Sequence, residues 1–289
     1  MSGPPAVPAA TVVLPTRDRH ASLRRALIAL AAQETARTWE LVIVDDGSTP
    51  PVSEADLPAG LPAVRVLPTG GVGPAQARNA GLGAATGDVV LFTDDDTEPA
   101  PTWIDAALAF LDDAPEHVGV EGPVASPPYD PLFGMSLRAT SPGQYWTCNV
   151  GFRRPVLQRL SGFYEGFPFA HCEDLDLAYR ALEHGPIGWA EAMRIVHHPR
   201  ALSFAELADR GRLTVSEIDL FARHRERFGR MRRVPARAFP LVSSIGFLRI
   251  MATEARRAPL RRGPRALALA VRFEFRVLGA VLRGPRART

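Results

Sequence analysis

The sequence contains no lysine, so all 34 of its basic residues are arginine. Nothing in protein folding forbids lysine, and we interpret its absence as the codon bias of a GC-rich genome. The chain has only two cysteines, Cys148 and Cys172, too few for the disulfide framework that small secreted domains need. We expect both to be packing residues, because nothing in the sequence around them marks a nucleophile.

Long apolar runs are also missing. No uninterrupted apolar stretch reaches the roughly 18–20 residues that a membrane-spanning helix needs, and the longest candidates, 239–251 and 266–282, are short or interrupted by arginine. Residues 1–10, which we expect to be disordered, lack the basic and apolar regions of a signal peptide. We therefore expect a cytoplasmic protein, peripheral at the inner face of the cell membrane if its tail binds lipid.

Apolar residues are abundant, at 46% against 22% charged residues, which is the profile of a soluble globular protein. The net charge of +3 hides an uneven distribution. Residues 1–199 have 13 Arg and 24 Asp plus Glu, a balance of −11, whereas residues 200–289 have 21 Arg and 7 Asp plus Glu, a balance of +14. We expect the acidic front part and the basic tail to meet different partners.

Strand-like and helix-like segments alternate along the front half. Four apolar runs predict buried strands, at 11–15, 41–44, 63–67 and 88–92, and residue spacing predicts helices at 22–33, 74–85, 103–111 and 174–184. This alternation predicts an α/β fold with a mostly parallel sheet flanked by helices on both faces. Residues 123–143 predict a long loop near the site, 146–152 a further strand, and 204 onward a helical region.

Acidic residues follow two of the predicted strands. The pair Asp45-Asp46 follows the second strand, and the triplet Asp94-Asp95-Asp96 follows the fourth. Ligands of parallel sheets bind beyond the carboxyl ends of the strands. Three adjacent carboxylates repel one another, and Mg²⁺ or Mn²⁺ bound to a diphosphate relieves that repulsion. The alternative is a solvated acidic turn or helix N-terminus, where aspartate is common.

These motifs belong to a longer series that resembles family 2 glycosyltransferases of the GT-A fold, over about residues 10–200. Six segments carry the resemblance, in the same order as in that family: 12–17 (VVLPTR), 44–48 (VDDGS), 73–81 (GPAQARNAG), 92–96 (FTDDD), 148–154 (CNVGFRR) and 173–177 (EDLDL). The resemblance implies a GT-A (Rossmann-like) fold. It also implies a glycosyltransferase that moves a sugar from a UDP- or dTDP-sugar to an acceptor hydroxyl with inversion, using Mn²⁺ or Mg²⁺.

The resemblance assigns donor-side roles to several residues. Pro15, Thr16 and Arg17 are expected to line the nucleobase pocket. Asp46 is expected to accept a hydrogen bond from a uracil or thymine N3–H, and Arg78 to contact the base or a carboxylate of the acidic turn. The alternatives are an exposed loop arginine for Arg17 and, for Asp46, a turn that satisfies its own backbone.

The metal site is expected at the aspartate triplet. By the resemblance, Asp96 is the direct metal ligand, and Asp94 belongs to the metal site and also lies on the ribose side of the donor. Asp95 is a further donor-binding position. His198, of the pair His197-His198, is expected as an additional ligand, since neutral imidazole suits Mn²⁺. A packed or surface histidine is the alternative.

The base is expected at Glu173-Asp174. An inverting transfer needs a base that takes the proton of the acceptor hydroxyl as its oxygen attacks the anomeric carbon, while the metal stabilises the departing diphosphate. By the resemblance Asp174 is that base, and Glu173 orients it or the acceptor. The alternative is that the acidic residues only cap a helix N-terminus, where carboxylates are favoured.

The predicted domains are a GT-A catalytic domain at 11–203 and a helical basic extension at 204–289. The catalytic domain has a nucleotide-sugar half at about 11–100 and an acceptor half at about 101–203. In a predicted helix over 264–285, arginines at spacings of 7, 4 and 7 form one stripe: Arg265, Arg272, Arg276 and Arg283. This helix either lies on anionic lipid or packs on the catalytic domain. Nucleic-acid binding is disfavoured, because the tail lacks interleaved aromatic residues.

Two rival functions are weighed against the transferase. A nucleotidyltransferase also pairs a doubly wound sheet with acidic metal ligands, but it usually has a glycine-rich, lysine-containing phosphate loop near its N-terminus. Here the first predicted strand leads to Pro15-Thr16-Arg17 with no glycine cluster, which disfavours this rival. A catalytically inactive nucleotide-sugar-binding module is disfavoured by the intact Asp94, Asp96 and Asp174. The donor sugar stays open, as does the acceptor, which is a glycan, a lipid-linked molecule or a small molecule.

Overall fold

The computed structural model describes residues 7–129, 134–239 and 263–283. Residues 1–6 of the predicted disordered segment lie outside this range, as do 240–262 and 284–289 of the predicted extension. The chain divides into two compact units. The first comprises 1–127, 136–165 and 173–199, and the second comprises 128–135, 166–172 and 200–289. The second unit thus begins close to the predicted boundary at 203 and also takes in two short segments of the front part.

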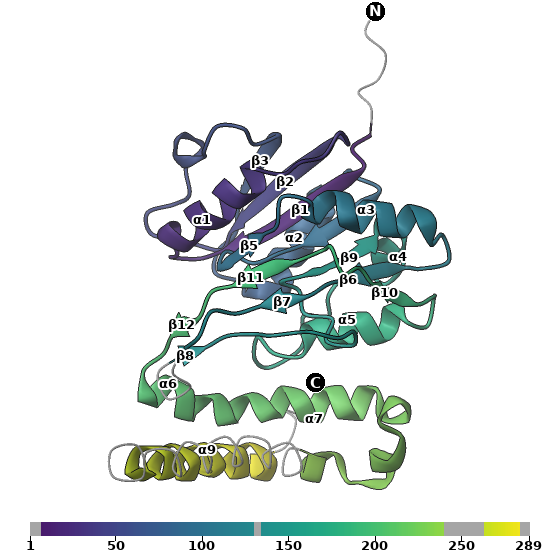
Figure 1. Ribbon diagram of the computed structural model, residues 1–289. Helices are drawn as coiled ribbons and strands as arrows, with labels where there is room; N and C mark the ends of the chain where they lie inside the picture. Colours follow the sequence, from purple (N-terminus) through teal and green to yellow (C-terminus); the bar gives the residue numbers. More distant parts are fainter. Residues whose placement is uncertain (1–6, 130–133, 240–262, 284–289) are drawn as a thin grey trace, which may run out of the picture. The chain divides into compact units, whose positions relative to one another are not determined.

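A seven-stranded sheet forms the centre of the first unit (Figure 1). In spatial order its strands are β10 (Ile187–Trp189), β6 (Gly119–Glu121), β9 (Val150–Arg153), β4 (Val89–Phe92), β1 (Ala10–Thr16), β2 (Trp39–Asp45) and β3 (Ala63–Pro68). Strand β9 is antiparallel to both of its neighbours, and the other pairings are parallel. The predicted α/β fold with a mostly parallel sheet is confirmed.

Helices cover both faces of this sheet. One face packs against α1 (His20–Ala31) and α3 (Trp103–Asp113), and the other against α2 (Pro74–Ala84), α4 (Arg154–Arg159) and α5 (Glu173–Ala181). Successive side chains of a strand point to opposite faces. Accordingly Val12 and Leu14 of β1 join the first core, and Val13 joins the second. Strands that are buried on both faces form nearly continuous apolar runs. The strands of this sheet could therefore be predicted from the sequence.

A small three-stranded sheet lies beside the end of β4. Its order is β5 (Thr97–Pro99), β11 (Ile195–His197) and β7 (Val124–Ala125). In the antiparallel pairing of β5 with β11, His197 lies opposite Thr97. This pairing brings a histidine from late in the chain next to the aspartate triplet.

Two segments differ from their sequence-based predictions. The strand predicted over 146–152 begins only at Val150, because Tyr145 has a left-handed backbone (φ 55°) and the chain before β9 turns toward Glu121. The loop predicted over 123–143 contains two short strands, β7 and β8 (Gly134–Met135). Strand β8 belongs to the second unit, where it pairs with β12 (Arg200–Ala201).

The second unit is mainly helical in its described part. It contains α6 (Phe204–Asp209), η2 (Arg210–Leu213), α7 (Thr214–Arg223), η3 (Arg225–Arg233), η4 (Ala236–Ala238) and α9 (Gly263–Arg283). Ser203 and Glu206 form a reciprocal capping box that fixes the start of α6. Buried apolar residues of α6 and α9 form a shared core cluster. Among the described residues, no helix combines the length and the apolar character needed to cross a bilayer.

Candidate active site

The acidic turn after β2 is held by its own carboxylates. Asp45 accepts hydrogen bonds from the backbone N–H groups of Ser48 (2.9 Å) and Val52 (2.8 Å). Burial by itself raises the pKa of Asp45, but these hydrogen bonds outweigh it and leave the pKa below its ordinary value. Asp45 therefore has a structural role in shaping the turn.

Asp46 fixes the loop that leads into α2. Its Oδ1 accepts hydrogen bonds from the Thr69 hydroxyl and the Val72 N–H, both at 2.7 Å, and its Oδ2 accepts one from the Gly73 N–H at 2.9 Å. A carboxylate has about four acceptor positions, so one position of Asp46 is left for a ligand. Arg17 lies at the same loop: a Cβ added at Gly71 would be 3.0 Å from its Nη1.

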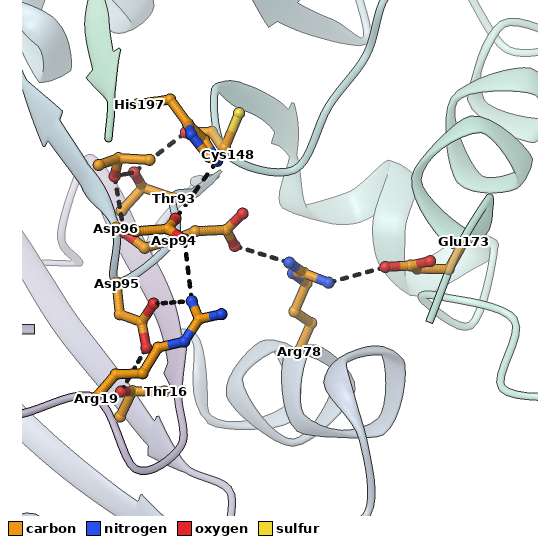
Figure 2. A network of polar contacts seen from close by, with 11 residues as sticks. Thr16, Arg19, Arg78, Thr93, Asp94, Asp95, Asp96, Cys148, Glu173 and His197 are labelled. Atoms are coloured by element: carbon orange, nitrogen blue, oxygen red, sulfur yellow. Dashed lines mark hydrogen bonds and ion pairs between the residues drawn. The ribbon is translucent and has the colours of Figure 1, made fainter. Parts of the chain in front are cut away.

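The aspartate triplet is held by two residues of the first loop, as Figure 2 shows. The buried Asp95 accepts hydrogen bonds from the Thr16 hydroxyl (2.7 Å) and from Nη1 of Arg19 (2.8 Å). The same Nη1 donates to Oδ2 of Asp96 at 3.0 Å. Burial raises the pKa of Asp95, although Arg19 and Thr16 oppose the shift. Thr16, a predicted nucleobase-pocket residue, thus points to the triplet.

The two adjacent histidines have different neighbours. Nε2 of His197 lies 3.5 Å from Oδ1 of Asp96, whereas Nε2 of His198 lies 2.7 Å from Oε1 of Glu98. Successive side chains of an extended chain point to opposite faces, so His197 at the end of β11 and His198 directly after it face different neighbours. Nδ1 of His197 is 3.0 Å from the Ser136 hydroxyl, which orients the ring. The backbone N–H of His198 donates to the carbonyl of Asp96 at 2.8 Å, but it is the imidazole of His197, and not that of the predicted ligand His198, that faces the Asp96 carboxylate.

Arg78 links the two acidic motifs (Figure 2). Its Nη2 donates to Oδ1 of Asp94 at 2.7 Å, and its Nη1 donates to Oε1 of Glu173 at 3.1 Å. Burial alone would lower the pKa of Arg78, but the facing carboxylates Asp94, Glu173 and Asp174 raise it, so the guanidinium stays charged. We expected Arg78 to contact the base or a carboxylate of the acidic turn. The carboxylates that it contacts are Asp94 and Glu173, because its position on α2 directs it to the end of β4.

Glu173 and Asp174 form the N-terminal turn of α5. Oδ1 of Asp174 accepts the N–H of Leu175 at 2.8 Å. Asp176, in the same turn, is fully buried and pairs with Arg180 at 2.8 Å, which gives it a structural role. Glu173 and Asp174 thus lie at the positive end of the helix dipole, where negative charge is favourable.

Five carboxylates of this site face two guanidinium groups. Arg19 interacts electrostatically with the aspartate triplet, and Arg78 with Asp94 and the Glu173-Asp174 pair. When all five carboxylates are ionised, the cluster has about three uncompensated negative charges. Such an excess favours binding of a cation. Cys148, next to this cluster, is buried, which raises the pKa of its thiol well above the ordinary value, so it stays a neutral packing residue.

The residues fit a hard divalent ion that completes its shell with other ligands. In the described part of the chain, no three His, Cys, Asp or Glu side chains are already grouped to hold a metal ion. However, Mg²⁺ typically uses only one or two carboxylates and fills the remaining positions with phosphate oxygens and water. Asp96 and His197 offer two donor atoms 3.5 Å apart, next to Asp94.

Comparison with known families identifies the fold family. The model of the family described as "Glycosyl transferase family 2" matches residues 11–161, which is more than half of the chain. The chain belongs to glycosyl transferase family 2. Five of the six segments that carry the resemblance lie within the matched region, which includes the aspartate triplet. The sixth segment, 173–177, which contains Glu173-Asp174, lies beyond it.

Two curated relatives in this family are glycosyltransferases by name. A Pre-mycofactocin glycosyltransferase of Mycobacterium tuberculosis is 29% identical over 262 residues, which cover 82% of this chain and 51% of that protein. A Validoxylamine A glucosyltransferase of Streptomyces hygroscopicus subsp. limoneus is 26% identical over 221 residues, covering 62% of this chain and 49% of that protein. The chain spans about half the length of these curated relatives.

Solved structures confirm the GT-A glycosyltransferase fold. The mannosyltransferase PcManGT from Pyrobaculum calidifontis, in complex with GDP-Man and Mn²⁺, has a TM-score of 0.58 at 19% identity, covering 95% of this chain and 88% of that one. S. aureus TarS 1-349 in complex with UDP has a TM-score of 0.51 at 21% identity, covering 72% and 65%. At these identities the likeness concerns the fold of the family 2 domain.

Sequence reasoning missed two contacts of the site. Arg19 was not singled out, because its only signal is its position two residues after Arg17 in the same loop. The choice between His197 and His198 depends on which face of β11 each occupies, and β11 is too short to show a periodic pattern.

Proposed function

We propose that the protein transfers a sugar from a nucleoside-diphosphate sugar to an acceptor hydroxyl with inversion. The observation that carries this proposal is the meeting of the aspartate triplet and the Glu173-Asp174 pair at one edge of the sheet, joined through Arg78. One motif is suited to a diphosphate with its cation, and the other to an acceptor hydroxyl. Membership of glycosyl transferase family 2 supports the proposal.

The donor is proposed to be a UDP- or dTDP-sugar. Asp46 has an acceptor position left for the N3–H of uracil or thymine. Arg17 lies at the same loop and is half exposed, so its guanidinium is accessible to a nucleotide, and Pro15 lies opposite Val44 in the neighbouring strand. The structural neighbours were solved with UDP in one case and GDP-Man in another, which supports a nucleoside-diphosphate donor in general.

A divalent cation, Mn²⁺ or Mg²⁺, is proposed as the cofactor. Asp96 and His197 would hold it, with Asp94 on the ribose side. The sequence predicted His198 as the histidine ligand, and we propose His197 in its place because its imidazole faces Asp96. The bound ion supplies charge neutralisation for the departing diphosphate. Arg19 holds Asp96 by one oxygen, Oδ2, and this leaves Oδ1 facing His197.

Asp174 is proposed as the base. It takes the proton of the acceptor hydroxyl while the hydroxyl oxygen forms a bond to the anomeric carbon. The bond between that carbon and the diphosphate oxygen breaks, and the nucleoside diphosphate leaves with the electron pair. Because one displacement occurs from the face opposite the leaving group, the configuration inverts. Glu173, which accepts a hydrogen bond from Arg78, orients Asp174 or the acceptor.

The experiment that tests this function compares Asp174→Asn with the wild type. Asparagine keeps the shape of the side chain but cannot take the proton, so donor affinity should be retained and transfer lost, by at least about 100-fold. Donor affinity is measured by calorimetry with UDP and dTDP in Mn²⁺, and transfer by mass spectrometry with a panel of sugars and acceptors. Wild-type turnover in Asp174→Asn would place the base elsewhere.

We also propose that α9 contacts an anionic membrane surface. Five large apolar side chains of α9 are exposed and fall within an arc of about 80° at 100° per residue: Leu267, Val271, Phe275, Leu278 and Leu282. The face that packs within the unit is a different one, with Leu269, Ala270 and Val277 buried. An apolar face with an arginine-rich surround is typical of helices that lie in an anionic interface.

The charge of the second unit supports this choice of partner. Residues 200–289 have an excess of 14 arginines over acidic residues. Arg210 is partly buried, and both this burial and the charge of Arg200 lower the pKa of Arg210. In the predicted stripe, Arg276 pairs with Asp209 at 3.2 Å and Arg272 lies over the ring of Phe204. The unit as a whole remains strongly positive, which suits a surface of anionic lipid.

A further inference from the structure

Helix α2 places Arg78 at the sheet edge through close contact with the strands. Gly81 is buried against the sheet: a Cβ added there would lie 2.5 Å from Cγ1 of Val13 and 3.1 Å from Cγ2 of Val44. Residues three apart share a helix face, so Arg78 lies on the same buried face. It is nearer the N-terminus of the helix, at the carboxyl ends of the strands.

The residue after Arg78 fixes the helix in this place. The side chain of Asn79 donates to the carbonyl of Phe163 at 2.9 Å and accepts from the N–H of Phe163 at 2.8 Å. It also donates to Glu165 at 2.8 Å. The ring of Phe163 in turn lies 5.9 Å from the Arg78 guanidinium carbon. The guanidinium is therefore held by a rigid surround rather than by its two carboxylate partners alone.

Arg78 joins carboxylates that are far apart in the sequence. Asp94 is 16 positions away and lies in the turn after β4, while Glu173 is 95 positions away and begins α5. One rigid, planar group thus sets the separation between the triplet and the turn that contains Asp174. A guanidinium is suited to this task because its donors are fixed in a fork.

The arrangement is poorly explained by stability alone. Burying an ion pair costs desolvation, and apolar residues of similar volume are often as stabilising. Nε of Arg78 is buried and has no hydrogen-bond partner, which costs about 1–3 kcal/mol. The guanidinium leaves its Nε–H without a partner while its two Nη groups donate to Glu173 and Asp94. This favours a role in positioning the two carboxylates.

We propose that Arg78 is a positioning residue that aligns Asp174 with the leaving group of the donor by tying Glu173 to Asp94. This inference rests on the proposed function, because it assumes that Asp174 is the base. Arg78 acts through the two carboxylates and does not touch the reacting atoms. A misplacement of about 1 Å at a reacting centre can cost about 100-fold in rate.

The test uses Arg78→Met and Arg78→Lys in the full chain, with Arg65→Met as the matched control. Arg65 also ties α2 to the sheet, through Glu40 (2.9 Å) and the carbonyl of Ala84, but it lies outside the acidic cluster. The assay measures release of UDP, dTDP or GDP from UDP-glucose, dTDP-glucose or GDP-mannose in Mn²⁺, with water as the acceptor. Calorimetry with the same nucleotides measures donor affinity.

We expect Arg78→Met to lower kcat by about 100-fold with unchanged nucleotide affinity. Arg78→Lys should recover part of the loss, since an ammonium is a point charge that meets one carboxylate but cannot bridge both. Arg65→Met should keep the wild-type kcat. If Arg78→Met has the kcat of the control, or loses nucleotide affinity as much as kcat, the inference is overturned.

Failure of the proposed function gives a different result. A wild-type protein that neither binds UDP, dTDP or GDP in the calorimetry nor releases nucleotide from any of the three sugars would contradict that function, and the role of Arg78 is then tested without catalysis. Hydrogen exchange then decides: Arg78→Met should speed exchange in the first turn of α5 relative to Arg65→Met, since the turn loses its anchor. Equal exchange in the two variants would overturn the positioning role.

Discussion

Two arginines divide the acidic residues of the site between them. Arg19 bonds to Asp95 and Asp96, and Arg78 bonds to Asp94 and Glu173. The sequence showed the carboxylates as motifs, because adjacent acidic residues at strand ends are conspicuous. It did not show which arginine serves which carboxylate, since that depends on where a loop and a helix place each guanidinium in space.

The two histidines give a prediction at this scale. His197→Ala should weaken Mn²⁺-dependent binding of UDP or dTDP by at least about 10-fold, because it removes the imidazole that faces Asp96. His198→Ala should leave this binding unchanged, because its ring lies against Glu98. Calorimetry with and without Mn²⁺ measures both. A loss confined to His198→Ala would support the ligand expected from sequence and contradict the geometry.

At the scale of elements, the long parallel strands were predictable and the short ones were not. Strands β1, β2 and β4 each contain an apolar run of three or more residues, because both of their faces are covered. By contrast, β5 and β11 have three residues each and depend on a partner far along the chain. Since β11 delivers the histidines, the sequence placed the triplet but not its neighbour.

Packing of α2 on the sheet gives a stability prediction with a control on the same helix. Gly81→Ala should destabilise the protein, by about 1–3 kcal/mol for overpacking less about 1 kcal/mol of helix propensity, because the new Cβ would meet Val13. Gly83→Ala should stabilise it by about 0.4–1 kcal/mol, because nothing lies within 4 Å. Urea denaturation measures both, and equal effects would refute the close contact.

Helix α9 gives a prediction about membranes. Phe275→Glu should reduce co-sedimentation with vesicles of phosphatidylglycerol, because it places a charge in the exposed apolar face, where Phe275 is 70% exposed. Ile28→Glu is the control, since Ile28 is a singly exposed residue of α1 at 50%. Phosphatidylcholine vesicles should bind both weakly. Equal binding of wild type and Phe275→Glu to the anionic vesicles would contradict the proposal.

At the scale of the whole molecule, the chain has a first unit that contains the match to glycosyl transferase family 2 and a second unit that is arginine-rich and mainly helical in its described part. The order of motifs along the sequence was enough to predict the first. The second unit was predicted as a basic helical extension whose last helix either lies on anionic lipid or packs on the catalytic domain. The sequence did not decide between these, because the role of a basic tail depends on which side chains its helices leave exposed. The exposed apolar face of α9 became visible only with the packing of Leu269 and Val277.

The most direct test of the central claim is calorimetric titration of wild type and Asp96→Asn with UDP and dTDP, with and without Mn²⁺. We expect Mn²⁺ to strengthen binding to the wild type and to have no effect on Asp96→Asn, since the amide cannot supply the anionic oxygen that a hard cation prefers. Mn²⁺-strengthened binding that persists in Asp96→Asn would contradict a cation site at the end of β4.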